Sequence, residues 1–137
     1  MTPAHYALRG LALAALIAAW PAAYAACDAG AGVLRGQTAK VALAFRTNPP
    51  AIKVGELFSL QAEICPQDGT SVTGLKVDAG MPAHKHGMNY QPQVSNSGPG
   101  KYTANGLMFH MPGLWQYTFD VETSAGRERI RVDYKAE

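Results

Sequence analysis

Hydrophobic and polar residues alternate with a period of two along most of the chain beyond residue 40. Val41, Leu43 and Phe45 form one such segment, and the residues from Phe58 to Ile64 form a second. Successive side chains of an extended strand point to opposite faces. This period therefore indicates strands that bury one face and expose the other. No helical periodicity is found after the first 25 residues.

Further segments with the same period follow at short intervals. They are 75–79, 102–104 with a continuation or a new strand over 107–110, 115–121 and 130–134. Another strand is expected over 88–94, where Pro92 favours an edge position. The composition of residues 95–100 predicts a turn. About seven short strands at regular spacing predict an all-β fold, an immunoglobulin-like antiparallel β-sandwich.

The first 25 residues carry a different pattern. His5 and Arg9 precede an uncharged apolar stretch, and Ala23-Tyr24-Ala25 has the small-x-small form of a cleavage site. Residues 1–25 are therefore predicted to be a signal peptide, and residues 26–137 to be a single β-sandwich domain. No later stretch is long enough to cross a bilayer. We therefore expect an exported protein of the periplasm without a retained membrane span.

The two cysteines, Cys27 and Cys65, both lie after the predicted cleavage site. In an oxidising compartment an even pair indicates a disulfide bond. A lipid anchor on Cys27 is the alternative, but Tyr24 occupies a position where lipoprotein signals carry a smaller aliphatic residue. A third alternative makes the thiolates metal ligands, although neither cysteine lies near the other candidate ligands in sequence.

After residue 25, every histidine and every methionine falls between residues 81 and 111. They form two groups within the segments 81–88 and 108–111. The predicted ligand set is His84, His86, His110, Met81, Met88, Met108 and Met111. Thioether sulfur suits Cu(I), and imidazole binds both copper oxidation states. The alternative is that the methionines fill the core and the histidines lie on the surface.

The residues around these groups favour copper over other metals. The region 81–111 contains no Asp, Glu or Cys, the residues that zinc sites combine with histidine. On an extended segment His84 and His86 would project to one face, as would Met108 and His110. A site of two or three imidazoles with one or two thioethers is expected where these segments converge.

The stretches Asp78–Met88 and Gly100–Trp115 carry a resemblance to a known family. Their Met-Pro-x-His-x-His-Gly-Met and Met-Pro-Gly-x-Trp elements resemble the YtkA-like domain family. They are also similar to the periplasmic part of FixH-like proteins of cytochrome oxidase assembly. The resemblance covers roughly residues 55–134. It implies an immunoglobulin-like sandwich of the bacterial envelope, often in a copper-handling context.

These observations favour a periplasmic protein that carries or sequesters copper, as Cu(I), Cu(II) or both, with a cuproprotein or oxidase as a possible acceptor. The alternative is a metal-free binding or assembly module that contacts a protein partner. No nucleophile motif, carboxylate pair or phosphate loop is present, so an enzyme is not expected. Without Arg9 the chain has 11 basic and 10 acidic residues, with no basic run that would indicate nucleic acid.

Overall fold

A computed structural model describes residue 27 and the ranges 33–67 and 69–137. The predicted signal peptide lies outside the described residues. Within them, no helix is long and apolar enough to span a membrane. The described strands are β1 (Leu34–Gln37), β2 (Val41–Asn48), β3 (Leu57–Pro66), β4 (Val72–Met81), β5 (His86–Gly87), β6 (Gln93–Gly98), β7 (Lys101–Met108), β8 (Gly113–Thr123) and β9 (Gly126–Ala136).

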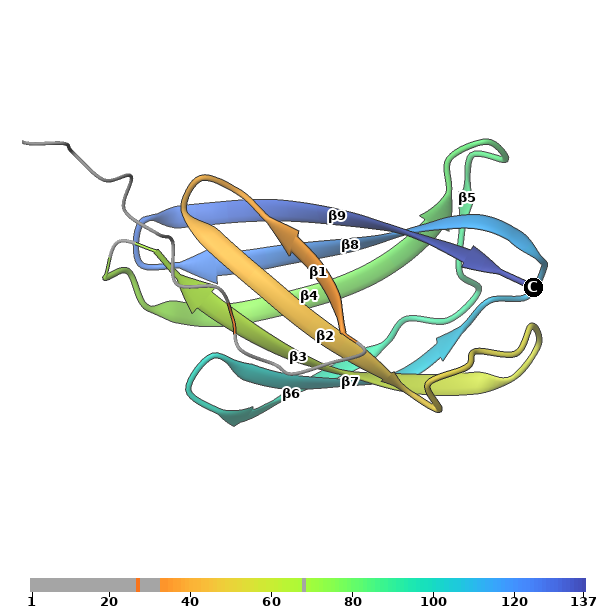
Figure 1. Ribbon diagram of the computed structural model, residues 1–137, viewed down its shortest axis with the longest axis horizontal. Coiled ribbons are helices and arrows are strands. Elements are labelled where there is room, and N and C mark those ends of the chain that lie inside the picture. Colours follow the sequence, from red (N-terminus) through yellow and green to blue (C-terminus); the bar gives the residue numbers. More distant parts are fainter. Residues whose placement is uncertain (1–26, 28–32, 68) are drawn as a thin grey trace, which may run out of the picture.

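The strands form two antiparallel sheets that pack face to face (Figure 1). One sheet has the order β1-β2-β3-β7-β6, and the other has the order β5-β4-β8-β9. The predicted antiparallel β-sandwich is confirmed, with nine described strands instead of about seven. The two unpredicted strands are β1, which is only partly buried, and β5, which has two residues. Both are too short to show a hydrophobic period.

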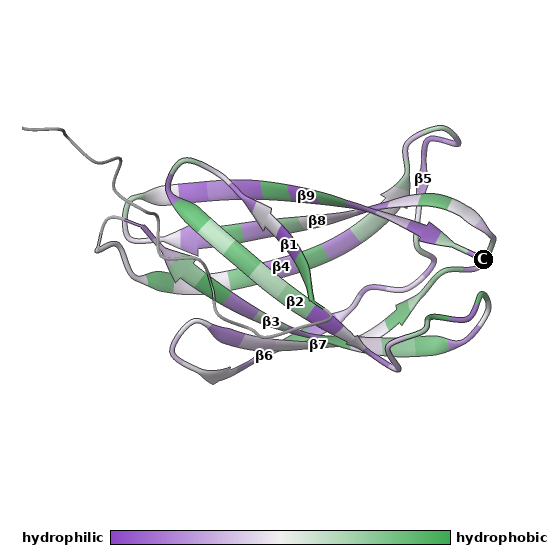
Figure 2. Ribbon diagram, in the orientation of Figure 1, coloured by the Kyte–Doolittle hydropathy of each residue, from purple (hydrophilic) through white to green (hydrophobic). Residues whose placement is uncertain are grey.

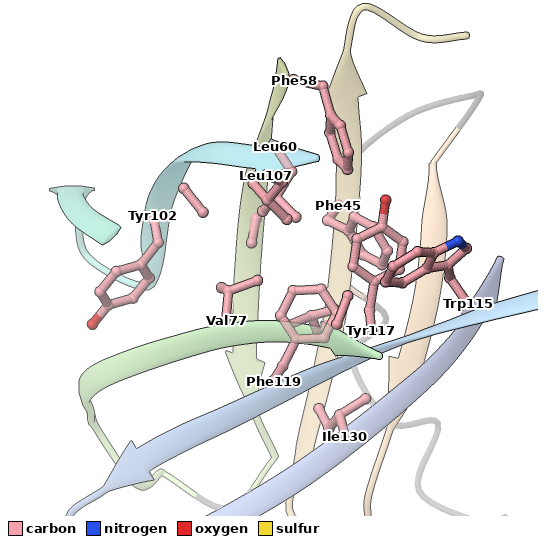
Figure 3. Close-up of a cluster of buried hydrophobic side chains, with 14 of the residues drawn as sticks. Phe45, Phe58, Leu60, Val77, Tyr102, Leu107, Trp115, Tyr117, Phe119 and Ile130 are labelled. Atoms are coloured by element: carbon pink, nitrogen blue, oxygen red, sulfur yellow. The ribbon is translucent and has the colours of Figure 1, made fainter. Parts of the chain in front are cut away.

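The core lies between the sheets, where the alternating residues predicted from the sequence meet. Figure 2 shows the resulting bands of hydrophobic and hydrophilic residues along the longer strands. Phe45 from β2 packs against Tyr117 and Phe119 from β8, with ring centroids 5.1 and 4.8 Å apart (Figure 3). Trp115 is fully buried at the start of the same strand. The period-two segments in β2 and β8 therefore supply most of the largest fully buried side chains.

The segment that follows β5 departs from the sequence prediction. Residues 88–92 are not a strand, and β6 instead covers residues 93–98, most of the expected turn. β6 is an edge strand whose side chains are mostly exposed, so it needs little apolar content. The turn is limited to Pro99 and Gly100. Gly100 has φ 66°, and a Cβ there would lie 2.6 Å from the Ile64 carbonyl oxygen.

The predicted disulfide between Cys27 and Cys65 is present, with Cα atoms 5.6 Å apart. Cys65 lies near the end of β3, whereas Leu57 at the start of β3 pairs with Met108. The eight residue steps between Leu57 and Cys65 span about 26 Å at the rise of a strand. The disulfide therefore holds the start of the described chain at the end of the sandwich opposite Met108.

Candidate functional site

The histidines belong to two segments, the β4–β5 hairpin with His84 and His86 and the β7–β8 loop with His110. Both segments lie at one end of the sandwich, at the right in Figure 1. The first loop joins β4 to β5, and His86 pairs with Met81 across this hairpin. The backbone N–H of His84 donates to the Met81 carbonyl at 3.0 Å and so closes the turn. Lys85 takes φ 54°, the left-handed region that non-glycine residues rarely adopt. The chain therefore reverses sharply between the two histidines.

This turn corrects the expectation of an extended segment. Residues 82–85 form a turn, so the strand period does not place His84 and His86 on one face. Their ring centroids are nevertheless 5.7 Å apart, because the turn at Lys85 brings the side chains together. The proximity of the two imidazoles was anticipated, but its structural cause was not.

The second loop joins β7 to β8 and is anchored on both sides of His110. Phe109 is fully buried, and its carbonyl accepts a hydrogen bond of 2.8 Å from the Gly55 backbone N–H. The Trp115 indole Nε1–H donates to the Met111 carbonyl at 3.0 Å. These contacts hold the loop against the core, so the backbone on both sides of His110 is fixed in position.

The two loops bring His86 and His110 together. Their ring centroids lie 5.1 Å apart, although the residues are separated by 24 positions in sequence. Two imidazoles that bind one metal ion through bonds of about 2.0–2.1 Å place their ring centroids roughly 5–6 Å apart. The distance between His86 and His110 falls in that range.

The hydrogen bonding of these rings leaves nitrogen atoms available. The His86 Nδ1 atom lies 3.3 Å from the Gly87 carbonyl oxygen, which can only accept a hydrogen bond. When Nδ1 carries the proton of the neutral ring, Nε2 keeps the lone pair that a metal requires. The His110 Nδ1 atom is buried and has no hydrogen-bond partner among the described residues. Such an orphaned buried nitrogen is uncommon in folded proteins.

The three imidazoles form a row with His86 in the middle. Within the described ranges, no three His, Cys, Asp or Glu side chains are placed so that they could hold one metal ion. His84 is exposed, whereas His86 and His110 are partly buried. Two of the three histidine rings thus lie at a distance that a shared metal ion would allow, and the predicted ligand set stays a prediction.

The four methionines fall into different environments. Met81 is 2% exposed and belongs to the core, where a Cβ added to Gly113 would lie 2.7 Å from its terminal methyl group. Met88 and Met111 are partly buried, and both border the histidine loops. Met108 is partly buried at the end of β7. Met81 packs as a core residue, and Met88, Met108 and Met111 each lie one or two positions from a histidine in the chain.

Trp115 adjoins two of the histidine rings, although its sequence pattern assigned it to the core alone. Its indole centroid lies 5.3 Å from the His110 ring and 6.0 Å from the His86 ring. It also stacks on Phe109 with centroids 4.5 Å apart. The signal available in the sequence was its position two residues after Gly113 in the Met-Pro-Gly-x-Trp element.

A hollow of about 410 Å³ lies beside His86 on the outer face of the β4-β8-β9 sheet. Its lining includes Lys76, Asp78 and the ion pair of Asp120 with Arg129. Hydrogen bonds of 2.6 and 2.8 Å from Arg129 to both carboxylate oxygens lower the pKa of Asp120. The hollow is therefore polar and carries both signs of charge.

Comparison with known proteins gives one match. The family model described as YtkA-like matches residues 36–120, which is more than half of the chain and includes both histidine loops. No curated protein and no solved structure matches the chain.

Proposed function

The chain belongs to the YtkA-like family, and on that premise we propose that it binds copper as cargo between its two histidine loops. The family membership suggests a domain of the periplasm or extracellular space. In this proposal the protein is exported, and it carries or sequesters copper for transfer to another copper protein.

One observation carries the proposal. The ring centroids of His86 in β5 and His110 in the β7–β8 loop lie 5.1 Å apart, and the buried Nδ1 of His110 has no hydrogen-bond partner among the described residues. Two imidazoles are a weak site for most metals, but neighbouring thioethers would complete a soft donor set that suits copper. We assign Met88, Met108 and Met111 as the candidate thioether ligands and Met81 to packing. His84 is exposed and is left outside the ligand set.

Copper titration of the full chain tests the proposal. His86→Ala should weaken copper binding by about 100-fold or more, because even the outer-shell partners of metal ligands contribute 10–100-fold. His110→Ala should have a similar effect. His84→Ala is the matched control, since it removes a neighbouring imidazole from the same turn and should change the affinity much less. Unchanged copper affinity in both His86→Ala and His110→Ala would place the site elsewhere.

The hollow beside His86 favours a second candidate function, a module that binds a protein partner. Its polar lining and exposed position are typical of the rim of an interface. This function requires no metal, so partner binding should persist after copper is removed with a chelator. The two functions are compatible if the partner docks next to the copper site.

A further inference from the structure

Trp115 contacts both histidines of the proposed copper site. We propose that its indole determines which ion the site accepts, selecting the soft monovalent ion Cu(I) over the divalent ions Cu(II) and Zn(II). This inference rests on the proposed function and names the form of its cargo.

The three ring distances restrict where a shared ion could lie. The ring centroids of His86 and His110 are 5.1 Å apart, and they lie 6.0 and 5.3 Å from the Trp115 indole. An ion bound to both imidazoles would lie about 3 Å from each imidazole centroid, given nitrogen–metal bonds of about 2.0–2.1 Å. Geometry then places it about 3–7 Å from the indole centroid, a range that largely overlaps the reach of a cation–π interaction.

The surroundings of the indole favour a particular kind of ion. Trp115 is fully buried, and it also stacks on the apolar ring of Phe109. This side of the site therefore offers a π-system, and the Met111 carbonyl oxygen beside it already accepts the indole Nε1–H. Cu(II) prefers tetragonal nitrogen and oxygen ligands, and Zn(II) prefers four nitrogen, sulfur or carboxylate ligands. Cu(I) accepts fewer ligands and tolerates thioethers. The stacked rings of Trp115 and Phe109 should therefore disfavour Cu(I) less than they disfavour Cu(II) or Zn(II).

Substitution of Trp115 tests the selectivity. Cu(I) and Cu(II) affinities would be measured separately, by competition with chelators specific for each oxidation state, in the full chain. Trp115→Leu should weaken Cu(I) binding by about tenfold, the effect of losing a desolvated cation–π contact, with Cu(II) binding unchanged or stronger. Trp115→Phe, which keeps an aromatic face, should lie between Trp115→Leu and the parent.

Phe119→Leu is the matched control for damage to the core. Phe119 is fully buried and packs on Phe45 and Tyr117, away from the histidine rings. It should lower stability in the same way as Trp115→Leu while leaving the ratio of Cu(I) to Cu(II) affinity unchanged. Equal ratios in the parent, Trp115→Leu and Trp115→Phe would overturn the inference.

A second measurement leaves the core intact. Trp20→Phe makes Trp115 the only tryptophan in the chain, so the fluorescence reports on this residue alone. Ag(I), a redox-inert substitute for Cu(I), should change the emission on binding, whereas Zn(II) should not. Unaltered emission at saturating Ag(I) would contradict the indole contact. A chain that binds neither copper ion would refute the proposed function itself, whereas copper binding without selectivity would refute only the role of Trp115.

Discussion

The two ends of the sandwich use most of their polar side chains in different ways. At the end with the β8–β9 turn, Thr123 donates its hydroxyl hydrogen to the Gly126 carbonyl at 2.7 Å and accepts the Ala125 N–H at 3.2 Å. Ser71 and Ser124 exchange two further hydrogen bonds across neighbouring loops. These side chains satisfy the turn backbone, although the Thr70 hydroxyl next to Ser71 is buried without a partner among the described residues.

At the other end, polar side chains face one another. The His86 ring contacts His84 on one side and His110 on the other, and the buried Nδ1 of His110 has no partner in the described chain. The turn between His84 and His86 keeps Lys85 in a left-handed conformation. Strained backbone and unpaired nitrogen are costs to folding, and they are tolerated where a ligand can make use of them. The comparison separates an end whose polar side chains mainly bond to backbone groups from an end whose histidine rings mainly contact one another.

The largest expected effect comes from removing the Trp115 side chain, which packs beside the histidine rings. Trp115→Ala should lower the free energy of unfolding by about 3–5 kcal/mol, the cost of deleting a large, fully buried side chain. Urea unfolding followed by circular dichroism would measure it. A loss below about 1 kcal/mol would mean that Trp115 does not anchor the β7–β8 loop.

The disulfide provides the corresponding test at the opposite end. Replacing Cys27 and Cys65 together with Ser should lower the free energy of unfolding by roughly 3–4 kcal/mol, because the bond closes a loop with a sequence separation of 38. The copper affinity of the folded variant should remain that of the parent, because the bond lies far from the histidines. Cys65 is about 26 Å along β3 from Leu57, the residue that pairs with Met108 at the histidine end. A weaker copper affinity would show that the ends are coupled.

Two glycines allow a matched comparison of the ends. Gly113 and Gly126 begin β8 and β9 with φ 130° and 118°, so alanine is strained at both. A Cβ at Gly113 would lie 2.7 Å from the Met81 methyl, whereas a Cβ at Gly126 would meet nothing within 4 Å. Gly113→Ala should therefore be about 1 kcal/mol more destabilising than Gly126→Ala.

A double-mutant cycle tests whether the additional destabilisation by Gly113→Ala comes from its contact with Met81. Met81→Ala removes the methyl group that a Cβ at Gly113 would meet, so the combined Gly113→Ala and Met81→Ala variant should be less destabilised than the sum of the single variants. The measurement is the midpoint of urea unfolding for all four proteins. Strict additivity would mean that Met81 moves aside without cost.

The smallest expected effect concerns the outer face of the β4-β8-β9 sheet. Hydrogen bonds from Arg129 lower the pKa of Asp120 below its ordinary value of 3.8. The carboxylate therefore stabilises the fold above about pH 4, and this contribution is lost as pH falls through the folded-state pKa. Asp120→Asn should remove up to about 1 kcal/mol of stability at neutral pH and reduce the loss in acid.

Glu122→Gln is the control for the acid prediction. Glu122 pairs with Arg127 on the same two strands, but both side chains are more exposed than Asp120. Its effect should be smaller, because water screens the pair. Equal acid profiles for the two variants would show that the burial of Asp120 contributes nothing.

The fold could be predicted where apolar residues alternate strictly. The pattern from Trp115 to Val121 places every second residue in the core, and the structure buries all four inward side chains. The alternation does not predict β6. This edge strand has mostly exposed side chains and contains polar residues such as Ser95 and Asn96. Backbone pairing with β7 defines that strand, and side-chain hydropathy carries no record of such pairing.

For the candidate site, the composition indicated which two segments to consider but not how their side chains are arranged. Clustering of histidine and methionine selected both loops, and the structure brings His86 and His110 together. The turn at Lys85 and the contact between Trp115 and both rings depend on how the two sheets are joined, which no local pattern encodes. The burial of Met81 likewise depends on Gly113, a residue 32 positions away.

The disulfide has a practical consequence for handling the protein. It fixes Cys27 beside Cys65, so a tag, a fluorophore or a solid support attached before Cys27 joins the molecule at the end away from the histidines. Molecules immobilised in this way would all present the loops of His86 and His110 to the solution. Surface-based binding measurements on such a sample would then report a single orientation.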